Sequence, residues 1–141
     1  MAVALRQAVR ADVRGIQRVR HSVNENRLTS TTISDDDVVV AIERTGKGWV
    51  VDADGRIVAF AIGNAETGNI WALFVEPEHE GKGYGRRLHD EMVNWLWSCG
   101  LTRLWLTTEP RTRAQRFYEA AGWRNSGSVA SGELLFERSA P

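Results

Sequence analysis

The most informative segment of the chain is Trp71-Ala-Leu-Phe-Val-Glu-Pro-Glu-His-Glu-Gly81-Lys-Gly83-Tyr-Gly85-Arg-Arg-Leu-His-Asp90. It begins with an apolar run typical of a strand, passes through a proline and a glycine-rich turn, and ends with helical spacing. Glycines remove the Cβ atoms that would block a ligand, and free N–H groups of the turn and the helix start converge on one point. The segment therefore predicts a site for a phosphate or pyrophosphate.

Positive charge surrounds this predicted anion site. The N-terminus of a helix carries about half a positive charge, and the side chains of Lys82, Arg86 and Arg87 can add to it. A second basic cluster follows further along the chain and contains Arg111, Arg113 and Arg116. If these clusters stood alone, solvated helix faces would be the preferred explanation for both.

The glycine turn matches neither of two common nucleotide-binding patterns. A P-loop ends in Gly-Lys-Ser/Thr, and that ending is missing. A dinucleotide-binding fold needs helical crossovers between its strands, whereas hairpin signals precede this turn. Because glycine turns before helices also occur for structural reasons, the turn alone does not decide whether a ligand binds.

The residues before the turn predict an antiparallel meander. Turn signals at Ala53–Arg56 and Glu66–Asn69 separate apolar runs, and Pro77 closes the last run because proline cannot donate to a strand ladder. The predicted strands are Trp49–Val51, Ile57–Ile62 and Ile70–Val75.

The N-terminal part predicts one strand and two helices. Residues 3–8 alternate as an edge strand does, and Asp12 stands at the expected N-cap of a helix that reaches about Asn26. Ser34 and Asp37 form a predicted capping box for a second helix that ends near Arg44.

The part after the turn alternates between helices and strands. Apolar residues recur at helical spacing twice, and Gly100 and Gly122 end the two helices. The predicted elements are a helix 84–99, a strand 104–106, a helix 114–121, and two strands, 123–125 and 134–137. The order β-α-α-β-β-β-α-β-α-β-β predicts an α+β (mixed α/β) fold with one mixed, mostly antiparallel sheet.

Composition indicates one ordinary globular domain spanning residues 1–141. The chain has 141 residues, of which 43% are hydrophobic and 26% are charged, with 18 basic and 18 acidic side chains. Zero net charge argues against a nucleic-acid partner. The single cysteine, Cys99, excludes an intramolecular disulfide, and no apolar run approaches a membrane span. We expect a cytoplasmic protein without a membrane partner.

Two motifs resemble those of the GCN5-related N-acetyltransferase (GNAT) superfamily. The segment from Leu73 to Gly85 is similar to its motif A, Arg/Gln-x-x-Gly-x-Gly/Ala, whose turn binds the pyrophosphate of coenzyme A. Residues 114–123 are similar to its motif B, which ends Tyr-x-x-x-Gly-Phe. The resemblance covers nearly the whole chain. It departs from the family at Glu80, where Arg or Gln is usual, and at Arg111, where many members have Asn.

The resemblance implies a fold and a way of binding the cofactor. About four helices flank a central sheet that is splayed between the strand ending near Val75 and the strand beginning near Leu104. The pantetheine arm of acetyl-CoA enters there, and an N–H of Phe74 or Val75 faces the thioester oxygen. The implied cofactor-binding residues are Leu73, Phe74, Val75, Gly81, Lys82, Gly83, Tyr84, Gly85, Arg86 and Arg113.

The resemblance implies that Tyr118 is the catalytic acid. A phenol titrates at about 10 and a thiol at about 8.5, so a positioned tyrosine can protonate a leaving thiolate. The alternative is that Tyr118 only packs in the apolar stripe of its helix. Candidates for the base are Glu109, His21, Asn24 and Glu25, and a relay through water would need none of them.

The implied activity is transfer of an acetyl group from acetyl-CoA to a primary amine of a small molecule or peptide, without a metal. A succinyl or longer acyl group is not distinguished from acetyl, and the acceptor amine is left open. The alternative function is a non-catalytic module of the same fold that holds acyl-CoA as a sensor. A homodimer is possible, because many family members are dimers.

Overall fold

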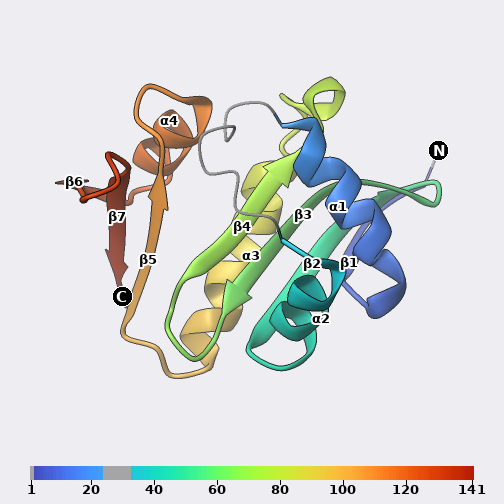
Figure 1. Ribbon diagram of the computed structural model, residues 1–141, viewed down its shortest axis with the longest axis horizontal. Coiled ribbons are helices and arrows are strands. Elements are labelled where there is room, and N and C mark those ends of the chain that lie inside the picture. The colour runs from blue at the N-terminus through green and yellow to red at the C-terminus, as the bar shows by residue number, and fades with distance from the viewer. Residues whose placement is uncertain (1, 24–32) are drawn as a thin grey trace.

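The computed structural model describes residues 2–23 and 33–141 of the protein, and Figure 1 shows its arrangement. The helices are α1 (Val13–Ser22), α2 (Asp35–Glu43), α3 (Tyr84–Ser98) and α4 (Arg113–Ala120). The strands are β1 (Val3–Gln7), β2 (Gly46–Ala53), β3 (Arg56–Asn64), β4 (Ile70–Val75), β5 (Arg103–Thr108), β6 (Arg124–Ser128) and β7 (Leu134–Ser139). Short 3-10 turns precede α1 at Arg10–Asp12 and follow β4 at Pro77–His79.

The strands form two antiparallel sheets that lie edge to edge. The larger sheet has the order β1-β2-β3-β4 and the smaller one β5-β7-β6. Among the described residues, one parallel bridge, Asn69 with Trp105, joins them at the start of β4 and β5. Beyond that bridge β4 and β5 diverge (Figure 1). The splay predicted between these strands is confirmed, and it divides the expected single sheet into two hydrogen-bonded halves.

Helices cover both faces of the larger sheet, and this burial explains the apolar run of β3. In β3, Phe60 and Ile62 face the core under α1 and α2, while Ala59 and Ala61 face the core under α3. A strand buried on both faces needs apolar residues at successive positions rather than at alternate ones. Burial of both faces therefore fits the position of β3 in the interior of the sheet, where it pairs with β4.

The first helix begins where it was predicted to begin, with Asp12 at the N-cap position of α1. The side chain of Asp12 makes no capping hydrogen bond to α1, however, and instead accepts one from the N–H of Val9 at 2.8 Å, across the preceding 3-10 turn. The same carboxylate forms an ion pair with Arg6 of β1 at 2.9 Å. The carboxylate thus caps the 3-10 turn and pairs with a neighbouring strand instead of capping α1. The predicted end near Asn26 lies outside the described residues, and α1 ends at Ser22.

The capping box predicted for the second helix is confirmed. Ser34 Oγ accepts a hydrogen bond from the N–H of Asp37 at 3.0 Å, and Asp37 accepts one from the N–H of Ser34 at 3.0 Å. The acidic first turn of α2 therefore satisfies the helix start. No helix in the described part of the chain is both long and apolar enough to cross a membrane.

Candidate active site

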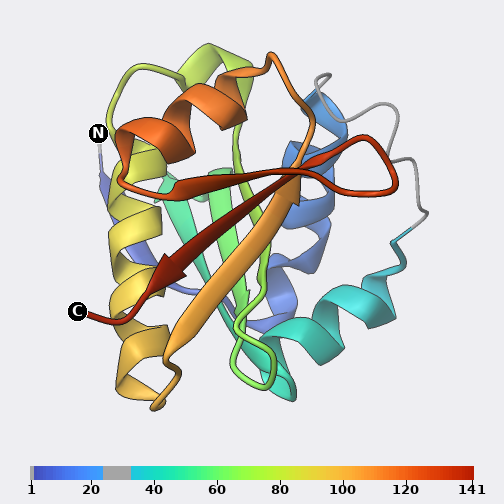
Figure 2. The same cartoon turned by 90° about the vertical axis from the view of Figure 1, so that its left-hand side faces the viewer.

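A cleft of about 760 Å³ opens where β4 and β5 diverge. Its walls are the end of β4, the loop that leads into α3, the start of α4 and Val23 after α1. Figure 2 shows α4 at the same end of the molecule as the loop into α3. The cleft thus joins the segments that resemble motifs A and B, which are distant in the sequence.

The structure brings together nearly all the predicted site residues. The lining includes Tyr118 and the predicted cofactor-binding residues Leu73, Phe74, Val75, Gly81, Gly83, Tyr84, Gly85, Arg86 and Arg113. Lys82 is exposed at the turn and does not belong to the lining. Sequence reasoning missed Val23 and His79, which also line the cleft.

The glycine turn has the backbone expected of an anion cradle. Gly81 and Gly83 have φ values of 79° and 83°, in the left-handed region that favours glycine. A Cβ at either position would meet no atom within 4 Å, so crowding is not the reason for glycine here. The reasons are the left-handed backbone and the open approach of a ligand to the turn. The first helical hydrogen bond runs from Arg87 N–H to Gly83 O at 3.1 Å. The N–H groups of residues 84–86 therefore remain available to a ligand.

One edge of β4 offers backbone groups to the cleft. The N–H of Glu76 donates to Val58 O in β3 at 2.8 Å, and backbone groups alternate in direction along a strand. Phe74 therefore directs its N–H toward β3, while Leu73 and Val75 direct theirs toward the cleft. This parity favours Val75 over Phe74 as the residue whose N–H faces a thioester oxygen.

Tyr118 lies at the base of the cleft within an aromatic cluster. Tyr118 is 6% exposed. Its ring centroid lies 5.2 Å from that of Phe117, 5.6 Å from that of Trp123 and 6.1 Å from that of Phe136. Burial raises the pKa of the Tyr118 phenol above its ordinary value. The side chain therefore stays protonated at neutral pH, which suits a proton donor and not a base. It both packs in the core and reaches the cleft.

His89 of α3 supports this cluster with a fixed tautomer. Trp123 Nε1–H donates to His89 Nε2 at 2.9 Å, so Nε2 is the unprotonated nitrogen. The proton then lies on Nδ1, which is 2.8 Å from Asp90 Oδ1. Burial lowers the pKa of His89, although Asp90 opposes that shift. The neutral imidazole thus links α3 to the aromatic cluster around Tyr118.

We expect His89 to make the protein less stable in acid. The unfolded state takes up a proton below a pH of about 6.5, and the native state resists that proton. The free energy of unfolding should therefore fall below this pH, by up to about 1.4 kcal/mol per pH unit. Urea titrations between pH 8 and 5 measure the slope. A His89→Gln variant should lose this part of the pH dependence, and an unchanged slope would contradict the account.

The loop between β5 and α4 contains a strained residue, Arg111, at the position where many GNAT members have Asn. Arg111 has a φ of 61°, which costs a residue with a long side chain more than it costs Asn or Gly. Its backbone N–H donates to Gln115 Oε1 at 2.6 Å, and Thr112 Oγ caps α4 by accepting from Gln115 N–H at 3.2 Å. The capping contacts hold Arg111 in this conformation.

Arg111→Gly should therefore stabilise the protein by about 0.5–1 kcal/mol, and Arg111→Asn by a smaller amount. Arg111→Ala is the matched control, because it removes the same charge without favouring a positive φ. Urea unfolding of the three variants measures the order. Equal stability of the Ala and Gly variants would show that backbone strain at this position is negligible.

Neither of the two candidate bases that the structure describes, Glu109 and His21, lines the cleft. Glu109 is half-buried after β5 and has one carboxylate oxygen, Oε1, that is buried without a hydrogen-bond partner among the described residues. It is not part of the cleft lining. His21 is exposed on α1, while Asn24 and Glu25 lie outside the described residues.

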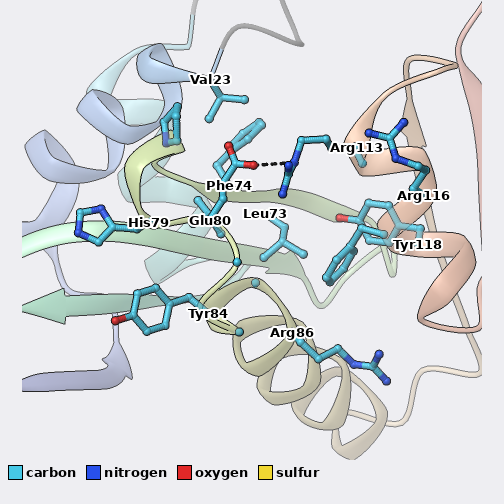
Figure 3. Close-up of a pocket in the computed structure, with 17 residues that line it drawn as sticks. Val23, Leu73, Phe74, His79, Glu80, Tyr84, Arg86, Arg113, Arg116 and Tyr118 are labelled. Carbon is cyan, nitrogen blue, oxygen red and sulfur yellow. Dashed lines mark ion pairs between the residues drawn. The ribbon is translucent and has the colours of Figure 1, made fainter.

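Glu80 and Arg113 face each other across the cleft (Figure 3). Arg113 Nε lies 2.5 Å from Glu80 Oε2. Arg86, the other arginine predicted to bind the cofactor, forms an ion pair with Asp90 at 3.1 Å. The two arginines predicted to bind the cofactor are thus each paired with a carboxylate.

Comparisons with known proteins agree with this geometry. Residues 10–123 match the acetyltransferase (GNAT) family. The chain is 36% identical over 81 residues to mycothiol acetyltransferase of Beutenbergia cavernae, an alignment that covers 53% of this chain and 27% of that protein. It is 30% identical over 97 residues to L-2,4-diaminobutyric acid acetyltransferase of Nocardia farcinica, covering 65% of this chain and 50% of that protein. The chain thus spans half or less of the length of these curated relatives.

Solved structures share the fold. The PaiA N-acetyltransferase of Thermoplasma acidophilum, solved in complex with coenzyme A, superimposes with a TM-score of 0.84 at 16% identity, covering 99% of this chain and 100% of that one. The ribosomal-protein-S18-alanine N-acetyltransferase of Escherichia coli superimposes with a TM-score of 0.72 at 18% identity, covering 96% and 91%. With the family match over most of its length, the chain belongs to the GNAT family of acetyltransferases.

Proposed function

We propose that this protein transfers an acetyl group from acetyl-CoA directly to a primary amine. The observation that carries the proposal is the single cleft that holds a glycine anion turn, a free strand edge and a buried phenol. Each of these features suits one part of an acyl-CoA molecule: the phosphates, the amide-bearing arm and the thioester. The residues present fit acetyl-CoA as the donor.

Binding would use backbone groups along the length of the cleft. The turn at Gly81–Gly85 and the N-terminus of α3 would receive the pyrophosphate. The outward groups of Leu73 and Val75 would pair with the amides of the pantetheine arm as an added strand does. The N–H of Val75 would stabilise the negative charge that develops on the thioester oxygen.

The transfer itself needs one attack and two proton movements. The amine nitrogen bonds to the thioester carbon, the carbon–sulfur bond breaks, and the sulfur leaves with the electron pair. Tyr118 would give its proton to that sulfur. The amine nitrogen loses a proton, and water would relay a proton back to Tyr118. Val75 and Tyr118 would thus each stabilise a negative charge of the reaction, Val75 the one on the thioester oxygen and Tyr118 the one on the leaving sulfur.

Relatives supply the acceptors for the first test. One is named for L-2,4-diaminobutyric acid, and another, from Haemophilus ducreyi, for the alanine of ribosomal protein bS18. We would offer diaminobutyric acid, a peptide that begins with alanine, a polyamine and an aminoglycoside with acetyl-CoA, and follow thiol release. Release that depends on one amine supports the proposal. Release with none of them, from a protein that binds acetyl-CoA, would favour the sensor alternative.

Succinyl-CoA in the same assay tests the choice of acyl group. We expect acetyl-CoA to be the better donor. A cytoplasmic location, one domain across residues 1–141 and a homodimer stay predictions from the sequence.

A further inference from the structure

The ion pair of Glu80 and Arg113 connects the two walls of the cleft. Glu80 lies directly before the glycine turn, and Arg113 is the first residue of α4. Both line the cleft, and their side chains meet at 2.5 Å (Figure 3). A carboxylate therefore lies directly before the glycine turn and holds the guanidinium of Arg113 there.

The pair is exposed enough to exchange partners. The side chain of Arg113 is 61% exposed and that of Glu80 is 29% exposed. Ion pairs at such positions stabilise proteins weakly, whereas arginine binds phosphate through two parallel hydrogen bonds. A phosphate bound at the glycine turn, residues 81–85, thus offers Arg113 an interaction at least as strong as its ion pair with Glu80.

We propose that Glu80 is an internal competitor that lowers the affinity for the cofactor by holding Arg113 until a cofactor phosphate takes its place. This inference rests on the proposed function, because it needs coenzyme A in the cleft. Glu80 then sets affinity without contacting the cofactor, and Arg113 contributes to binding only after it changes partner. The phosphate concerned is either the pyrophosphate or the 3′-phosphate.

Calorimetric titration of the parent protein and four variants with coenzyme A at 0.15 M salt tests the exchange. The variants are Glu80→Gln, Arg113→Gln, the double variant, and the control Glu91→Gln, which removes an exposed charge from α3 outside the cleft lining. We expect Glu80→Gln to tighten binding about threefold to tenfold and Arg113→Gln to weaken it about tenfold. In the Arg113→Gln background, Glu80→Gln should change the affinity less than twofold. Glu91→Gln should match the parent.

The outcomes separate this inference from the proposed function. If the parent does not bind coenzyme A, the proposed function fails. If the parent binds but Glu80→Gln is no tighter, competition by Glu80 is wrong. Equal or greater tightening in the Arg113→Gln background would also overturn it, because Glu80 would then simply repel the phosphates.

Repeating the titrations with 3′-dephospho-CoA identifies the phosphate. A retained gain for Glu80→Gln would assign Arg113 to the pyrophosphate, and a lost gain would assign it to the 3′-phosphate. Thermal melts of each variant verify that the fold is intact before the affinities are compared.

Discussion

Replacing Tyr118 with Phe should lower kcat by about 100-fold or more while the affinity for acetyl-CoA changes less than twofold. The phenol oxygen supplies the proton for the leaving sulfur, and the ring supplies the packing against Phe117, Trp123 and Phe136. Phe keeps the ring and removes the proton donor. Steady-state kinetics with the best amine from the acceptor panel, beside calorimetry with acetyl-CoA, measures the two quantities separately.

This experiment also decides between the two interpretations of Tyr118. Retention of kcat within threefold would mean that the residue only packs in its cluster. A loss of acetyl-CoA affinity equal to the loss of kcat would mean that the hydroxyl serves binding. A thermal melt of the variant should agree with the parent, because the aromatic contacts are conserved.

Gly83→Trp should abolish binding of acetyl-CoA, raising Kd by 100-fold or more. Gly83 has a φ of 83° and lines the cleft at the turn that would hold the pyrophosphate. An indole there would occupy the approach to the free N–H groups of α3. The positive φ adds a cost of roughly 1–2 kcal/mol to the stability of any variant with a side chain.

Gly55→Trp is the matched control for that strain. Gly55 lies in the hairpin between β2 and β3 with a φ of 88°, and a Cβ there would likewise meet no atom within 4 Å. Both variants should lose similar stability in urea, and Gly55→Trp should bind acetyl-CoA like the parent. Parent-like binding by Gly83→Trp would move the phosphates away from this turn.

Local sequence patterns were sufficient for most elements of the fold. The capping box at Ser34 and Asp37 and the three-strand meander depend on neighbouring residues, and both are present. Asp12 stands at the predicted N-cap position, but its carboxylate pairs with Arg6 in a different element instead of capping α1. The alternative partner comes from tertiary structure, which spacing along the chain does not encode.

The candidate site shows the same division. The glycine turn and Tyr118 could be found from motifs, because each motif lies within one short segment. Three other features join residues far apart in the sequence. They are the place of Val23 in the cleft lining, the ion pair of Glu80 with Arg113, and the hydrogen bond from Trp123 to His89. The positive φ of Arg111 was equally hidden, since Arg carries no signal for a left-handed backbone.

Calorimetric titration of the purified protein with acetyl-CoA tests the central claim most directly. The account predicts one site with a Kd near the micromolar range, which corresponds to a binding free energy of about −8 kcal/mol. It also predicts a rise in Tm of roughly 5–10 °C when the acetyl-CoA concentration is a hundred times Kd. Absence of both binding heat and a thermal shift with acetyl-CoA would contradict the account. The glycine turn would then have only a structural role or bind a different anion.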